Sequence, residues 1–199
     1  MNFNRRHFLS AVTASSAGLI ASGAFATVRT GDKPALLSHA MAALDKHGSA
    51  IRNRDIIGLV DFSAPSRLPR FDLVHIGNGQ VLSSYLVSHG RGSDPANSGW
   101  AKLFSNRPGS NASSCGSFLT GTTYYGKHGR SRRLHGLDAE NSMAAPRAIV
   151  IHGASYVTPV MARTQGRVGR SLGCFAVSNT EIDEVLAKLG QDRLLFAWK

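Results

Sequence analysis

Two short segments of the sequence hold the residue types that nucleophilic catalysis requires. Residues 150–153 read V-I-H-G, and residues 170–175 read R-S-L-G-C-F. A cysteine beside a turn-forming glycine can expose its sulfur, and a histidine at the end of another strand can accept the thiol proton. Backbone N–H groups around Gly173 and Cys174 could then hold the oxyanion of an attacked amide. The pattern predicts Cys174 as a nucleophile and His152 as its base, although a cysteine alone is usually a small buried apolar group.

A serine nucleophile is the competing interpretation of the same segment. Residues 169–173 read G-R-S-L-G and fit the G-x-S-x-G elbow, which needs a following helix and a later triad histidine. His152 is the last histidine of the chain, and the residues after Gly173 favour a strand. Ser171 is therefore not expected to be a nucleophile.

The histidines do not form a recognisable metal-binding pattern. His128, His135 and His152 show neither H-x-x-x-H nor H-E-x-x-H spacing. The nearby acids Asp138 and Glu140 do not complete a ligand set. We therefore expect no metal and no other cofactor.

The composition indicates a globular protein with a large excess of positive charge. Of 199 residues, 42% are hydrophobic and 18% charged, which excludes disorder driven by charge. The net charge of +11 favours an anionic polymer as partner: nucleic acid, an acidic membrane surface or a carboxylate-rich wall polymer. Aromatic residues make up only 8%, a poor supply of stacking surfaces for single-stranded nucleic acid.

Residues 1–26 are expected to be an export signal. They carry Arg5 and Arg6 but no acidic residue, and residues 4–9 resemble the twin-arginine signature. A weakly apolar stretch follows and ends in Ala24-Phe25-Ala26, which fits the A-x-A cleavage rule. The alternative is a retained anchor, but the stretch holds many Ser, Thr and Gly residues for a membrane span. We expect cleavage after Ala26, location in the periplasm or cell envelope, no stable membrane insertion afterwards and no nucleic-acid partner.

The elements that must position Cys174 and His152 are expected to be mostly strands. Apolar runs predict strands at residues 56–62, 71–76, 81–87, 117–125, 147–152, 174–177 and 194–198. Asn78-Gly79 between the second and third runs predicts a hairpin. Helical spacing predicts a helix between residues 34 and 48 and another after a capping box at residues 178–181. Residues 126–146 are expected to be irregular. The fold class is therefore mainly β, with a helical lead-in over residues 27–54 and one domain over residues 55–199.

The paired segments resemble a known enzyme family. I-V-I-H-G-A at residues 149–154 with R-S-L-G-C-F-A-V-S at residues 170–178 resembles the L,D-transpeptidases of the YkuD type. The upstream Y-G-K-H-G of residues 125–129 and L-H-G-L of residues 134–137 are similar to the murein L,D-transpeptidase catalytic-domain branch. The resemblance covers roughly residues 55–199. It implies a YkuD-type β-sandwich with a few peripheral helices.

The resemblance also implies roles for individual residues. Cys174 matches the nucleophile, His152 the general base and Gly173 the motif glycine, while the carbonyl of Gly153 would orient the imidazole in place of a triad acid. The candidate substrate-binding residues are Ser171, Arg170, Tyr125 and His135. The sequence departs from the common motif at Leu172, where the family usually has a second histidine.

The reaction implied is cleavage after the L-centre of diaminopimelate in a peptidoglycan stem peptide. A thioester on Cys174 would pass its acyl group to an amine, and carbapenems are expected to acylate the same thiol. With water as acceptor the protein would be an L,D-carboxypeptidase or endopeptidase, and a non-catalytic wall-binding module is a third possibility. The sequence leaves the first two open, as it does the oligomeric state. It also leaves open whether Cys115 is a buried apolar residue or an oxidisable partner of Cys174.

Overall fold

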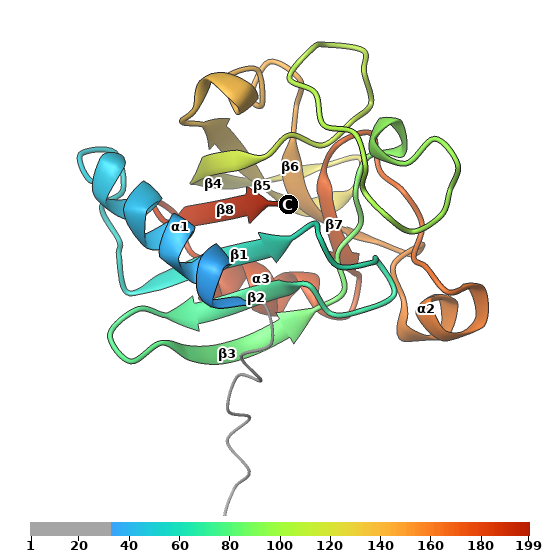
Figure 1. Ribbon diagram of the computed structural model, residues 1–199, viewed down its shortest axis with the longest axis horizontal. Helices are drawn as coiled ribbons and strands as arrows, with labels where there is room; N and C mark the ends of the chain where they lie inside the picture. Colours follow the sequence, from blue (N-terminus) through green and yellow to red (C-terminus); the bar gives the residue numbers. More distant parts are fainter. Residues whose placement is uncertain (1–32) are drawn as a thin grey trace, which may run out of the picture.

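The computed structural model describes residues 33–199, which form a mainly-β domain with three α-helices (Figure 1). The helices are α1 (Lys33–Lys46), α2 (Pro159–Gln165) and α3 (Ile182–Lys188). The strands are β1 (Ile56–Asp61), β2 (Phe71–His75), β3 (Gln80–Tyr85), β4 (Gly116–Gly126), β5 (Gly129–Gly136), β6 (Val150–Ala154), β7 (Phe175–Ser178) and β8 (Leu194–Trp198). The expected fold class is confirmed, whereas the export signal predicted for residues 1–26 lies outside the described residues. Within residues 33–199 no helix is both long and apolar enough to cross a membrane.

The strands form one mixed sheet whose two edges approach each other. Its order is β3-β2-β1-β8-β4-β5-β6-β7, with β1 parallel to β8 and β6 parallel to β7. The chain leaving β3 at one edge runs along β7 at the other edge. There the Ser88 N–H donates to the Ala176 carbonyl, and the Ser171 N–H donates to the His89 carbonyl, both at 2.9 Å. The sheet therefore curls until its two halves face each other across a shared core.

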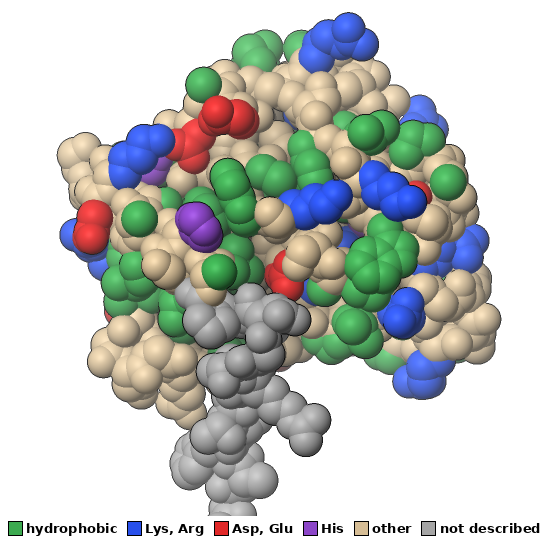
Figure 2. All heavy atoms as spheres, viewed as in Figure 1, with side chains coloured by type: hydrophobic (Ala, Val, Ile, Leu, Met, Phe, Trp, Pro, Cys, Tyr) green, Lys and Arg blue, Asp and Glu red, His purple; other side chains and the backbone are tan. Residues whose placement is uncertain are grey.

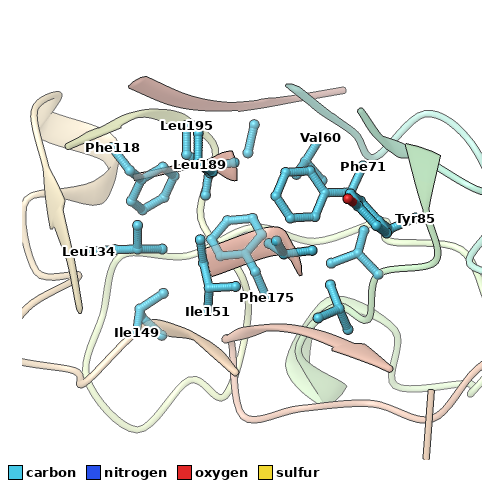
Figure 3. Packing of buried hydrophobic residues seen from close by; sticks show 14 of the residues in the cluster. Val60, Phe71, Tyr85, Phe118, Leu134, Ile149, Ile151, Phe175, Leu189 and Leu195 are labelled. Atoms are coloured by element: carbon cyan, nitrogen blue, oxygen red, sulfur yellow. The ribbon is translucent and has the colours of Figure 1, made fainter. Parts of the chain in front are cut away.

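Aromatic side chains from both halves of the sheet meet inside this curl. Phe62, which follows β1, stacks on Phe175 of β7 with ring centroids 6.0 Å apart. Phe118 of β4 meets the same ring edge-on at 5.3 Å (Figure 3). These rings are fully buried, and burying a side chain of this size contributes about 1.5–3 kcal/mol. The contact fixes β7, and hence the residue before it, against the first half of the sheet.

Helix α1 covers the opposite face of β1 and β8. Its Leu36, Ala40 and Leu44 pack in a second cluster with Ile57 and Phe196. Alternate residues of β8 therefore face two different clusters, the α1 cluster and the central core. Burial on both faces explains why these strands read as continuous apolar runs in the sequence.

Three details of the secondary structure differ from expectation. The first is α2, a seven-residue helix at residues where no element was predicted. The predicted irregular segment 126–146 contains β5, which the sequence hid because this strand carries arginines instead of an apolar run. The guanidinium of Arg132 is buried and donates to the carbonyls of Gly121 and Leu186. The predicted capping box is also wrong, since Glu181 caps α3 without a side-chain hydrogen bond.

A buried polar network holds the chain that leaves β3 and closes the sheet against β7. The Arg70 guanidinium donates to the Val87 carbonyl at 3.0 Å and to His89 Nδ1 at 2.8 Å. Because a guanidinium only donates, His89 Nδ1 carries no proton, and its Nε2–H faces the Asp94 carboxylate at 3.4 Å. Burial, assisted by the charge of Arg70, lowers the pKa of His89 to about 4. His89 is therefore a neutral structural residue at neutral pH.

We predict that acidification destabilises the domain through His89. Between its ordinary pKa of 6.5 and the folded value of about 4, the unfolded chain binds the proton and the folded chain does not. The free energy of unfolding therefore falls as pH falls through this window, by about 2–3 kcal/mol for this residue. Urea denaturation of wild type and His89→Gln at pH 7 and pH 4.5 measures it. A glutamine variant that loses as much stability on acidification as wild type would contradict the assignment.

Candidate active site

Cys174 and His152 come from adjacent parallel strands at one side of the curled sheet. β6 pairs with β7 in the register His152↔Ala176, and Cys174 directly precedes β7. Ile151 and Phe175 face the central core, so the alternation of strand residues directs His152 and Cys174 to the opposite face. The structure thus brings the two predicted catalytic residues to the same face of neighbouring strands.

The orientation of the His152 imidazole is fixed by its own backbone. Its Nδ1 lies 2.8 Å from the carbonyl oxygen of Gly153. Since a carbonyl only accepts, Nδ1 must carry the proton, and the neutral ring presents a free lone pair at Nε2. A backbone carbonyl therefore holds this ring in one tautomer.

The electrostatics keep this imidazole neutral. Burial is the main cause that lowers the pKa of His152, and the nearby His128 and Lys127 lower it further. The hydrogen bond to Gly153 opposes them in part. A neutral imidazole at neutral pH is able to accept a proton.

The Cys174 thiol is buried enough to stay protonated at rest. Burial raises the pKa of this thiol, while a backbone hydrogen bond from Val150 and the charges of Lys127 and Arg147 oppose the rise. The sulfur lies 3.5 Å from the carbonyl oxygen of Ala148, to which it donates. No hydrogen bond within residues 33–199 joins this sulfur to the His152 ring. The thiol and the imidazole are therefore both neutral at rest.

The turn before Cys174 requires glycine and is built around Ser171. Gly173 has a φ of +119°, and a Cβ there would lie 2.8 Å from both the Ala112 oxygen and Ile149 Cδ1. The Ser171 hydroxyl accepts from the Gly173 N–H at 3.1 Å and donates to the Cys174 carbonyl at 2.7 Å. The Gly173 N–H is thus occupied, which leaves the Cys174 N–H as the candidate oxyanion donor of the two.

The other expected substrate-binding residues lie in three different places. Tyr125 is 83% exposed at the end of β4, and His135 is exposed on β5 opposite Leu119. Arg170 is half-buried, and its guanidinium donates to the Asp94 carbonyl in the segment that closes the sheet. Among residues 33–199 no three His, Cys, Asp or Glu side chains gather as a metal site.

One residue that the sequence assigned no role contacts the proposed base directly. The His128 ring, from the turn between β4 and β5, stacks on the His152 ring with centroids 4.2 Å apart and planes 21° apart. His128 belongs to the Y-G-K-H-G run of the sequence. Only the β4–β5 hairpin brings its ring onto His152, and the sequence predicted an irregular segment there.

Cys115 lies in a different environment from Cys174. It lines a groove of about 730 Å³ beside α1, whose wall includes His39 and Trp198 but neither Cys174 nor His152. Figure 2 shows this side of the molecule, with hydrophobic side chains gathered next to α1. Both cysteines are free thiols, and burial raises the pKa of Cys115 to about 12.

We predict that protein purified in air without reductant contains two free thiols and that Cys174 is alkylated first. A thiol whose pKa is about 12 has almost no thiolate at pH 8, whereas two cations oppose the rise at Cys174. Thiol titration gives the count, and peptide mapping after brief iodoacetamide treatment gives the order. Loss of both thiols in air would instead support an oxidisable pair.

Comparison with known proteins identifies the family. Residues 29–198 match the family described as L,D-transpeptidase catalytic domain. Among solved structures, an L,D-transpeptidase from Mycobacterium smegmatis is 13% identical with a TM-score of 0.43, and the match covers 73% of this chain and 59% of that one. L,D-transpeptidase 3 from Mycobacterium tuberculosis is 11% identical with a TM-score of 0.45, covering 73% and 61%. One from Xylanimonas cellulosilytica is 17% identical with a TM-score of 0.42, covering 79% and 68%.

The assignment rests on the family match, since the structural likenesses are remote. The chain spans about three fifths of the length of the two mycobacterial enzymes. No curated protein sequence matches it. Because the family match extends over most of the sequence, including both the His152 and the Cys174 segments, the chain belongs to the L,D-transpeptidase catalytic domain family.

Proposed function

We propose that this protein is an exported peptidoglycan L,D-transpeptidase that works through a thioester on Cys174. The observation that carries the proposal is the His152 imidazole, held by the Gly153 carbonyl with Nε2 free, on the face it shares with Cys174. Membership of the family supplies the reaction class. Export would follow from the signal expected at residues 1–26, and the site of action would be the cell envelope.

The first half-reaction forms the thioester. The Cys174 thiol turns from the Ala148 carbonyl toward Nε2 of His152, which takes its proton as the sulfur bonds to the stem-peptide carbonyl. The Cys174 N–H faces the negative charge that develops on the carbonyl oxygen. The carbon–nitrogen bond then breaks, and the leaving amine takes the proton from His152.

The second half-reaction uses the same groups in reverse. An amine of a second stem peptide attacks the thioester carbonyl, and His152 removes a proton from this amine. The new amide forms, the carbon–sulfur bond breaks, and the proton returns to the Cys174 sulfur. Water in place of the amine would give hydrolysis, so the acceptor that reaches the thioester decides the product.

Positive charge near the site would attract the carboxylates of stem peptides. Lys127 acts electrostatically on both Cys174 and His152, and Arg147 acts on Cys174. An excess of one sign of charge raises the local concentration of an oppositely charged substrate. We retain Tyr125, His135 and Arg170 as proposed substrate contacts, and we propose that Ser171 acts by shaping the turn that presents Cys174.

We predict that Cys174→Ala and His152→Ala each reduce turnover below about a thousandth of wild type, because one removes the bond-forming atom and the other its base. The protein without residues 1–26 is incubated with purified muropeptides and the products are weighed by mass spectrometry. Linked dimers show transfer, whereas shortened stems show hydrolysis. Cys115→Ala is the matched control and should keep full activity. Dimers formed by Cys174→Ala would disprove the nucleophile.

We also predict that Gly173→Ala reduces turnover at least a hundredfold, comparable to losing one oxyanion donor. The new methyl group would require both a strained φ and displacement of the Ala112 carbonyl, which moves Cys174. Gly109→Ala is the matched control, since Gly109 also has positive φ (+79°) but open space around it. Equal activity of the two variants in the muropeptide assay would contradict this role of Gly173.

A further inference from the structure

We propose that His128 is a positioning residue that covers the His152 imidazole and holds it in the plane required for proton transfer. This inference rests on the proposed function, since it assigns a supporting role at the same site. The stacked pair, with centroids 4.2 Å apart, is the observation that carries it.

The stack places one exposed ring over one buried ring. His152 is 1% exposed, whereas His128 is exposed at the tip of its turn. Within residues 33–199 the His152 ring makes one hydrogen bond, from Nδ1 to the Gly153 carbonyl, so only packing limits rotation of the ring about that bond. A ring lying parallel on its face limits such tilting and also keeps water from that face.

The turn that carries His128 is tied to the site through the pairing of the strands on either side of it. Gly126 and Gly129 pair to close the β4–β5 hairpin, and Gly129 adopts a φ of +73° in open space, so glycine serves the backbone geometry there. Ser131 of β5 then pairs with His152 of β6. The register of one strand thus fixes both the base and the residue that covers it.

Side-chain contacts hold the same hairpin from its flanks. The Arg133 guanidinium lies over the Tyr124 ring at 4.4 Å, which links the two strands. Arg130 forms an ion pair with Asp183 of α3 at 3.0 Å. A hairpin restrained in this way can deliver one ring to a defined position.

The His128 ring also affects the pKa of His152, because it buries one face of the imidazole. Burial is the main cause of its lowered pKa, and part of that burial comes from His128. Among the described residues, the other charged group that acts on both rings is Lys127 in the same turn. Burial and Lys127 also lower the pKa of His128, so the stack joins two neutral rings at neutral pH. Removing the cover should therefore raise the pKa of His152 toward its ordinary value.

The test compares a variant that removes the ring with one that keeps it. His128→Ala uncovers His152, whereas His128→Phe retains an aromatic ring without a titratable group. The pKa of His152 is read from NMR titration of its ring signals, assigned by their loss in His152→Ala. The pH dependence of kcat/KM is measured with muropeptides, and His75→Ala on β2 controls for loss of a half-buried histidine outside the site.

We expect His128→Ala to raise the pKa of His152 by on the order of one unit. The acidic limb of kcat/KM should move up with it, and kcat/KM at pH 6 should fall about threefold, while His128→Phe should stay close to wild type. An unchanged His152 titration in the alanine variant would overturn the proposal. So would a phenylalanine variant that behaves like alanine, because the role would then need an imidazole. If wild type shows no turnover, the proposed function fails, but the NMR titration still decides whether His128 covers His152.

Discussion

The structure depends on closure of the curled sheet between the chain after β3 and the chain around β7. Main-chain hydrogen bonds join residues 88–91 to residues 171–176. They connect the two edges of the sheet, which are its first strand, β3, and its last strand, β7. The closure buries the aromatic core between the two halves. It also satisfies backbone groups on both edges, which would otherwise be open to pairing with another chain. Arg70 reinforces this closure from inside, because it fills a buried position with donors for carbonyls that no neighbouring strand reaches.

The same closure prepares the chemistry. Ser171 is held through its main chain by His89 and Arg91, and its hydroxyl shapes the turn that ends at Cys174. His152 lies on β6, the strand that pairs with β7, and the carbonyl of Gly153 fixes the tautomer of its ring. The proposed nucleophile and the proposed base are thus positioned by hydrogen bonds within the scaffold, and no acidic residue of the described part of the chain bonds to the His152 ring. The raised pKa of Cys174 and the lowered pKa of His152 favour a neutral pair, so in the proposed reaction proton transfer accompanies attack.

The sequence was informative wherever a local pattern reports a local structure. Apolar runs located seven of the eight strands, and the His-Gly and Gly-Cys segments pointed to the residues that the sheet brings to one face. β5 was missed because only Leu134 of its buried residues is apolar, while the buried Ser131 and Arg132 do not indicate a strand. The stack of His128 on His152 depends on the register between β5 and β6, and the role of Ser171 depends on hydrogen bonds within a turn. Neither has a signature in residue type alone.

The most direct test of the central claim is to trap and locate the acyl-enzyme. The protein without residues 1–26 is incubated with a carbapenem, weighed intact and then digested for peptide mapping. We expect one adduct per chain, on the peptide that contains Cys174, with slower labelling in His152→Ala because the thiol has lost its base. An unchanged mass in the wild type, or an adduct that persists in Cys174→Ala, would contradict it.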